Sequence, residues 1–174
     1  MTSRRLSYAG LMIAAGLTGV YAESIPNFEV LTLVVFASGV LLGARDGALL
    51  GMLTMLIYSL LNPYGVAHPL VTAAQVAGQA VAGSAGGMSV GLAARSAGPR
   101  AVWLAGIGAG LTALYDVMTN LATGIVLGPT RAVLIGGIPF ALWHIGTNAA
   151  LFATVGTPIV AVFARYRSRL FSSP

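Results

Sequence analysis

Residues 101–127, AVWLAGIGAGLTALYDVMTNLATGIVL, decide the fold class of this chain. Asp116 is the one charged residue in this run, which is longer than the roughly 20 apolar residues that a bilayer-crossing helix needs. The turn-forming residues Gly128 and Pro129 end it. The run therefore predicts a transmembrane helix that carries a carboxylate.

The composition of the whole chain agrees with this prediction. Of 174 residues, 57% are hydrophobic and 7% are charged, whereas a soluble domain carries about 25% charged residues. The mean hydropathy is +0.88. The absence of cysteine excludes disulfides, thiolate chemistry and cysteine-ligated metals. We therefore expect an all-α integral membrane protein.

Five further apolar runs lie around this segment and are separated by turn residues or arginines. Two of them, at residues 29–43 and 47–61, are short for a span. We expect Pro139 to begin the last run, because it follows two glycines and proline is favoured in the first helical turn. The chain is thus predicted to be a single bundle, residues 1–174, with six spans at residues 8–22, 29–43, 47–61, 69–94, 101–127 and 139–166.

The arginines orient this bundle. With six spans, one side of the membrane receives Arg4, Arg5, Arg45, Arg95, Arg100, Arg165, Arg167 and Arg169. Only Arg131 falls on the other side. Positively charged loops stay in the cytoplasm, which predicts a multi-pass protein of a bacterial cytoplasmic (inner) membrane with both termini inside. The alternative is that the first run is a cleavable signal peptide, which would leave five spans.

Three consecutive spans each carry a polar pair with i,i+4 spacing, which places both members on one helix face. The pairs are Gln75 with Gln79, Asp116 with Asn120, and His144 with Asn148. With the predicted span limits, all three pairs reach the outer half of the bilayer. The simplest common cause is a substrate-binding cavity that opens outward.

These polar groups could instead only fasten the helices to one another. For Asp116 we favour the functional interpretation, because an unpaired buried carboxylate is costly. We expect His144 to be its partner. Asn27, Glu29, Tyr64 and His68 flank the predicted outer loops and complete the candidate substrate-binding set, although Asn and Pro in such loops also simply end helices.

The first span has small residues every four positions, at Gly10, Ala14 and Thr18. Small residues let another helix approach closely, so this face is a candidate for docking a partner or for internal packing. No enzyme constellation stands out. The phosphate-binding loop Gly-x-x-x-x-Gly-Lys and the zinc motif His-Glu-x-x-His are both absent. We expect neither catalysis, nor a metal site, nor a cofactor, nor nucleic-acid binding.

Four short segments and one polar pair of this chain are characteristic: residues 25–29 (IPNFE), 43–47 (GARDG), 58–65 (YSLLNPYG) and 115–120 (YDVMTN), and His144 with Asn148. With these segments, its length and its six predicted spans, the chain resembles the substrate-binding S components of energy-coupling factor (ECF) transporters. The resemblance covers nearly the whole chain.

The resemblance implies that the chain binds a vitamin or related micronutrient outside the cell and associates with a transmembrane coupling subunit and two ATPases. It leaves the substrate open, and we lean towards cobalamin or another corrinoid over riboflavin and other vitamin precursors. The resemblance also implies an Ala-x-x-x-Ala-type pattern in the first helix, which family members use for docking the coupling subunit. The strict pattern is absent here, and Gly10-x-x-x-Ala14 is a looser version of it. A solitary transporter, a structural or assembly subunit and an intramembrane enzyme are the alternatives.

Overall fold

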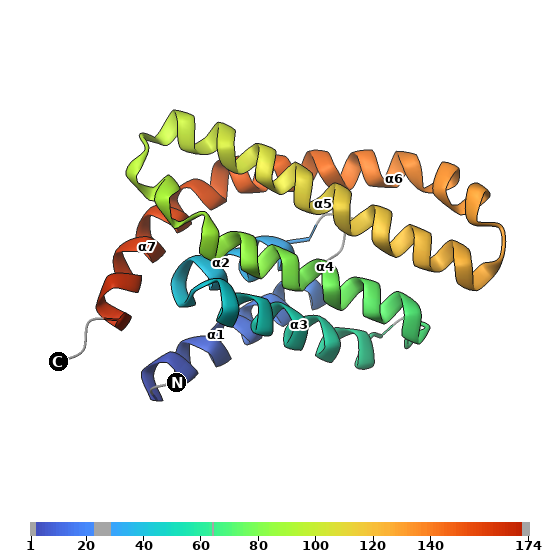
Figure 1. Cartoon of the computed structure of the whole chain (residues 1–174), viewed down its shortest axis with the longest axis horizontal. Helices are drawn as coiled ribbons and strands as arrows, with labels where there is room; N and C mark the ends of the chain where they lie inside the picture. Colours follow the sequence, from blue (N-terminus) through green and yellow to red (C-terminus); the bar gives the residue numbers. More distant parts are fainter. Residues whose placement is uncertain (1–2, 23–28, 64, 172–174) are drawn as a thin grey trace.

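The computed structural model describes residues 3–22, 29–63 and 65–171. This part of the chain is helical and contains no strand, which confirms the predicted all-α class. The elements are α1 (Ser3–Tyr21), α2 (Leu31–Leu42), α3 (Ala44–Leu60), α4 (Pro69–Met88), the 3₁₀ helix η1 (Val90–Ala94), α5 (Ala97–Leu127), α6 (Thr130–Leu151), the π-helical η2 (Phe152–Gly156) and α7 (Thr157–Phe171). Successive long helices run back and forth along the bundle, and both chain ends lie near the same end of it (Figure 1).

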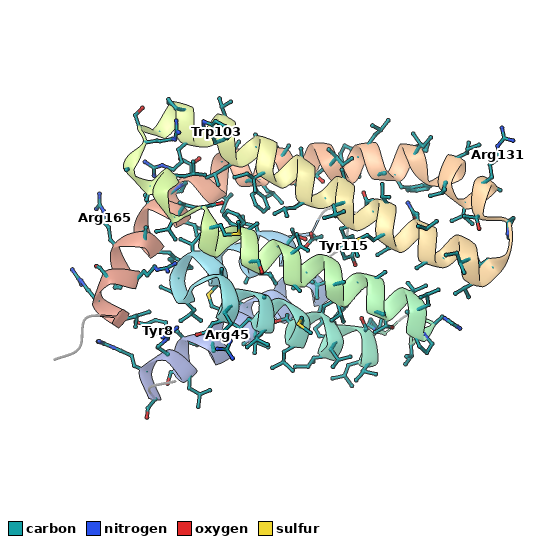
Figure 2. The ribbon with its side chains drawn as sticks, viewed as in Figure 1. Tyr8, Arg45, Trp103, Tyr115, Arg131 and Arg165 are labelled. Atoms are coloured by element: carbon teal, nitrogen blue, oxygen red, sulfur yellow. The ribbon has the colours of Figure 1, made fainter. Side chains whose placement is uncertain are left out.

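Two segments of the described chain are long and apolar enough to cross a membrane. They are α5, with 31 residues, and the continuous run Thr130–Leu170, with 41 residues. Only 17% and 28% of their apolar stretches are buried inside the structure. The core helix of a soluble protein would be mostly buried, whereas these helices expose large side chains such as Trp103, Phe140 and Trp143. Figure 2 shows Trp103 on the outer surface of α5.

The second predicted span is shorter in the structure than the sequence suggested. α2 has 12 residues, or about 18 Å at 1.5 Å per residue, which is less than the roughly 30 Å hydrocarbon core of a bilayer. Every residue of α2 except Val34 is buried. α2 packs against α1, α3, α4 and α7, so it is the central helix of the bundle.

Glycines allow α2, α3 and α4 to pack at close range. A Cβ atom added to Gly39 would lie 1.9 Å from the carbonyl oxygen of Gly83, and one added to Gly83 would lie 2.0 Å from that of Gly47. Neither contact leaves room for a methyl group, because the atoms that it would meet belong to the backbone. Glycine at these positions therefore sets how closely the three helices approach.

The prediction that Pro139 begins the last long helix is wrong. α6 begins at Thr130, and Pro139 lies inside it. Gly128, with φ 93°, ends α5, and Thr130 then packs against Gly124 as the chain reverses. Proline inside a helix removes one backbone hydrogen bond, which neighbouring helices in a membrane bundle can tolerate. His144 therefore lies farther from the start of its helix than the predicted span of residues 139–166 implied.

Arginines from separate helices meet at one end of the bundle. Arg5 of α1 forms a 2.6 Å ion pair with Asp46 of α3 and donates to the carbonyl of Leu42. Arg167 of α7 donates to the carbonyl of Val40, and Arg100 of α5 donates to that of Thr157. Figure 2 shows Arg131, in the first turn of α6, at the opposite tip. The charge asymmetry read from the sequence is thus present in three dimensions.

Candidate functional site

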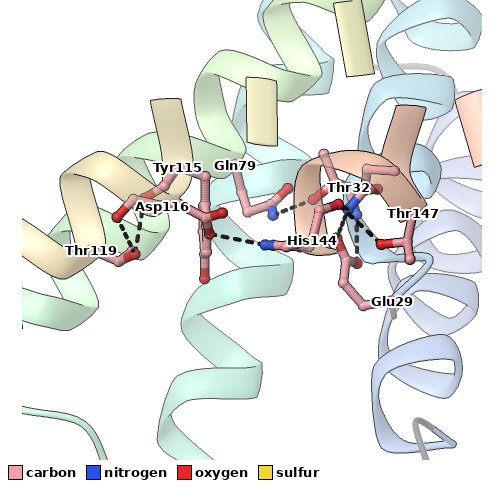
Figure 3. Close-up of polar contacts among 9 residues, drawn as sticks. Glu29, Thr32, Gln79, Tyr115, Asp116, Thr119, His144 and Thr147 are labelled. Atoms are coloured by element: carbon pink, nitrogen blue, oxygen red, sulfur yellow. Dashed lines mark hydrogen bonds and ion pairs between the residues drawn. The ribbon is translucent and has the colours of Figure 1, made fainter. Parts of the chain in front are cut away.

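A histidine between two carboxylates forms the centre of the candidate site (Figure 3). The Nδ1 atom of His144, on α6, lies 2.9 Å from Oδ1 of Asp116, on α5. Its Nε2 atom lies 3.6 Å from Oε1 of Glu29, just before α2. The side chains of His144, Asp116 and Glu29 are 9%, 13% and 12% exposed. The predicted pairing of Asp116 with His144 is confirmed, and Glu29 joins the pair from a third element.

Glu29 also organises the start of α2. Its Oε2 atom accepts a 3.0 Å hydrogen bond from the backbone N–H of Thr32, one of the amides that a helix start leaves without a partner. Gln79 Nε2, on α4, donates to the Thr32 hydroxyl at 3.0 Å. Asn148 Nδ2, on α6, lies 3.5 Å from Glu29 Oε1. One carboxylate therefore connects α2 directly to α6 and, through Thr32, to α4.

The remaining members of the three polar pairs lie at the edge of this cluster. Gln75 Oε1 accepts a hydrogen bond from the Ser59 hydroxyl at 3.1 Å, which connects α4 to α3. The Asn120 amide faces α6 at Gly137, where a Cβ atom would lie 2.8 Å from Nδ2. One of the two glycines that precede Pro139 therefore lets α6 approach Asn120.

Two cavities adjoin the cluster. The larger, of about 380 Å³, is lined by polar residues of α4, α5 and α6, among them Gln75, Asp116 and Asn120. The smaller, of about 220 Å³, is lined by residues that include Glu29 and Gln79. Gln75, Tyr115 and His144 line both cavities and form the wall between them. The tyrosine and histidine rings meet edge to face, with centroids 6.3 Å apart.

His68, one of the predicted loop residues, does not join this site. His68 is exposed and caps α4, with its Nδ1 atom accepting from the backbone N–H of Leu70 at 3.2 Å. It lines neither cavity. Asn27 and Tyr64 lie outside the described residues. Of the two candidates near the loops that the structure describes, Glu29 lies in the cluster and His68 does not.

Sequence reasoning missed three residues of the site. Tyr115 precedes Asp116 and was quoted only as part of the family resemblance, as was Tyr58, which lines the smaller cavity. Thr32 was not considered at all. Its position three residues after an acidic residue at a predicted helix start was the available signal, because such spacing is typical of capping interactions.

The small-residue face of α1 lies on the outside of the bundle. Gly10, Ala14 and Thr18 are all exposed, and a Cβ atom at Gly10 would meet nothing within 4 Å. The opposite face, with Ala9, Gly16 and Val20, packs inward. Of the two roles considered for the small residues, internal packing is therefore excluded for these three by the described contacts.

Among the described residues, no group of three or more His, Cys, Asp or Glu side chains is arranged to hold a metal ion. No family model, curated protein or solved structure matches this chain. The site itself offers two carboxylates, one imidazole and several amides, and they lie beside cavities large enough for a small molecule.

Proposed function

We propose that this chain is a six-pass membrane protein that captures a vitamin-sized molecule outside the cell for uptake, as S components of ECF transporters do. Both termini lie in the cytoplasm, and the chain works with a transmembrane coupling subunit and two ATPases. The chain's own role is binding, without catalysis.

Exposure and charge support the membrane part of the proposal. Monomeric soluble proteins rarely expose large contiguous apolar patches, whereas α5 and α6 carry many exposed large apolar side chains. Arginine contacts gather at one end of the bundle, as expected for the cytoplasmic side of a membrane protein. α2 is too short for a full crossing, but it is enclosed by its neighbours and does not have to match the bilayer thickness.

The observation that carries the binding function is the Glu29–His144–Asp116 cluster beside two cavities. Ionisable side chains inside a membrane protein are costly, and they mark substrate or ion sites far more often than in a soluble core. A bundle that needed only to hold its helices together could do so with small residues and neutral hydrogen bonds.

Cavity size bears on the choice of substrate. Pockets for drug-sized ligands measure about 300–1,000 Å³. The larger cavity, at about 380 Å³, is near the lower end of that range. A single-ring or two-ring vitamin precursor fits this size better than a corrinoid, which has several times as many atoms. The substrate is therefore a small heterocyclic micronutrient.

The exposed face of α1 supports the partner part of the proposal. Gly10 and Ala14 have no internal role in packing that a docked helix would disturb. Small residues on an outward face allow close approach of another membrane helix. A coupling subunit docked there would leave the binding site between α4, α5 and α6 untouched.

Mass spectrometry of small molecules that copurify with the detergent-solubilised chain tests this function. We expect one micronutrient-sized compound to be enriched with the wild-type protein and depleted with Asp116→Asn. Asp46→Asn is the matched control, because it makes the same change in a carboxylate that pairs with Arg5 away from the cavities. If no compound is enriched, and if Asp116→Asn changes only thermal stability, the structural-subunit alternative holds instead.

A further inference from the structure

The acceptor atoms around the cluster outnumber the donors that reach them. Among the described residues, three buried acceptor oxygens of the cluster have no hydrogen-bond partner: Asp116 Oδ2, Gln79 Oε1 and Asn148 Oδ1. The hydroxyl of Thr112 on α5 and His144 Nε2, which lies 3.6 Å from Glu29 Oε1, also lack one. Gln79 and Asn148 are 3% and 0% exposed, so bulk water does not satisfy them. Buried polar atoms are nearly always paired, and each exception asks for an explanation. The missing chemistry here is a set of hydrogen-bond donors.

The cluster also carries more negative than positive charge. Within the described chain, the ion pairs of Glu29 and of Asp116 are both with His144. Even an imidazolium that donates from both ring nitrogens carries one positive charge against two carboxylates. A buried charge without compensation is strongly unfavourable. A ligand that brings a positive charge would balance the site.

The unpaired acceptor and the excess negative charge both involve Asp116. Its Oδ1 atom is occupied by His144 and its Oδ2 atom is unpaired, and Asp116 lines the larger cavity together with Gln75 and Asn120. The described residues offer no three-ligand metal site, so an organic cation fits better than an inorganic one. Gln79 lines the smaller cavity and Asn148 lines neither, so of the three unpaired acceptors only Asp116 belongs to the larger cavity. We infer that the larger cavity binds a small organic cation that donates an N–H to Asp116, and that Asp116 is its counter-ion. This inference rests on the proposed binding function and names its substrate class.

An isosteric series separates charge from shape. Benzamidine, benzamide and benzoate have nearly the same flat outline but are cationic, neutral and anionic. The thermal midpoint of the purified full-length chain in detergent would be measured against increasing concentrations of each, because a ligand that binds only the folded state raises this midpoint. We expect the dissociation constant for benzamidine to be at least about tenfold lower than that for benzamide, as for a charge-assisted hydrogen bond. Benzoate should give no shift.

Three variants locate the effect. Asp116→Asn should abolish the preference for benzamidine over benzamide, whereas Asp46→Asn should keep it. Asn120→Asp adds a carboxylate to the same cavity and should strengthen the benzamidine response, which keeps the test informative if Asp116→Asn does not fold. Equal or stronger stabilisation by benzamide or benzoate, a response to none of the three, or an Asp116→Asn variant that keeps the preference would overturn the inference. A neutral or anionic compound in the copurification experiment would also overturn it while supporting the binding function itself.

Discussion

The Nδ1 atom of His144 lies 2.9 Å from Oδ1 of Asp116, and this contact joins α6 to α5 inside the bundle. Glu29 approaches the other ring nitrogen to 3.6 Å. The imidazole is therefore the shared partner of two carboxylates from different elements. Its removal affects both of them at once.

The first prediction concerns the stability of this cluster. His144→Gln leaves two buried carboxylates without a cation, and the loss of one partner of a buried ion pair costs about 3–5 kcal/mol. The double variant His144→Gln/Asp116→Asn should be more stable than His144→Gln alone, because one unpaired charge is gone. Thermal melts of the single and double variants measure this coupling. Additive effects would contradict a direct interaction between the two side chains.

Ligand affinity is the subject of the second prediction. Gln75→Ala and Asn120→Ala each remove an amide that lines the larger cavity, and the loss of such a group costs about 1–3 kcal/mol, or roughly 5- to 150-fold in affinity. The measurement is a titration of each purified variant with the copurified compound. Thr154→Ala, an exposed change whose hydroxyl bonds only within its own helix, is the control. If alanine at all six paired polar positions leaves affinity within about twofold, the site lies elsewhere.

The third prediction is the topology, which single cysteines can test because the chain has none. Cysteines at positions 68 and 131 should react with a membrane-impermeant reagent added outside intact cells. Cysteines at positions 45 and 165 should react only after the cytoplasmic side is opened, since these arginines belong to the positive end. Labelling of position 68 from the cytoplasmic side alone would reject the six-pass arrangement.

The fourth prediction concerns the close packing of α3 and α4. Gly83→Ala places a methyl group 2.0 Å from the Gly47 carbonyl oxygen, and overpacking of this kind typically costs about 1–3 kcal/mol. Gly106→Ala, on α5, is the matched control because its Cβ atom would meet nothing within 4 Å and alanine favours a helix. Thermal melts in detergent should show destabilisation for Gly83→Ala only.

The fifth prediction separates transport from binding. Gly10→Leu and Ala14→Leu place large side chains on the exposed face of α1, so they should abolish uptake in cells while the purified chain binds its substrate normally. Gly16→Leu is the contrasting variant, because its Cβ atom would lie 3.0 Å from Leu31 and disturb the interior. Normal uptake with Gly10→Leu/Ala14→Leu would show that no partner docks on this face.

Local sequence patterns predicted some features of the site and misplaced others. The i,i+4 spacing predicted one polar face on each of three helices, and the cost of an unpaired buried carboxylate predicted that Asp116 would pair with His144. A second local pattern, the preference of proline for the first helical turn, placed Pro139 at a helix start after Gly136 and Gly137. The structure continues α6 through all three residues, and Gly137 lets α6 approach Asn120 closely.

The sequence by itself determined the helical class, the arginine-rich end and the polar faces of α4, α5 and α6. These properties depend on residue types and on the 3.6-residue helical period, which act within one helix. Only the tertiary structure decided that α2 is the buried centre, that Glu29 rather than His68 completes the site, and that Tyr115 divides two cavities. Those outcomes depend on how each helix is rotated and how closely it approaches its neighbours. Backbone contacts at glycines such as Gly39 and Gly83, far apart in the chain, set that approach.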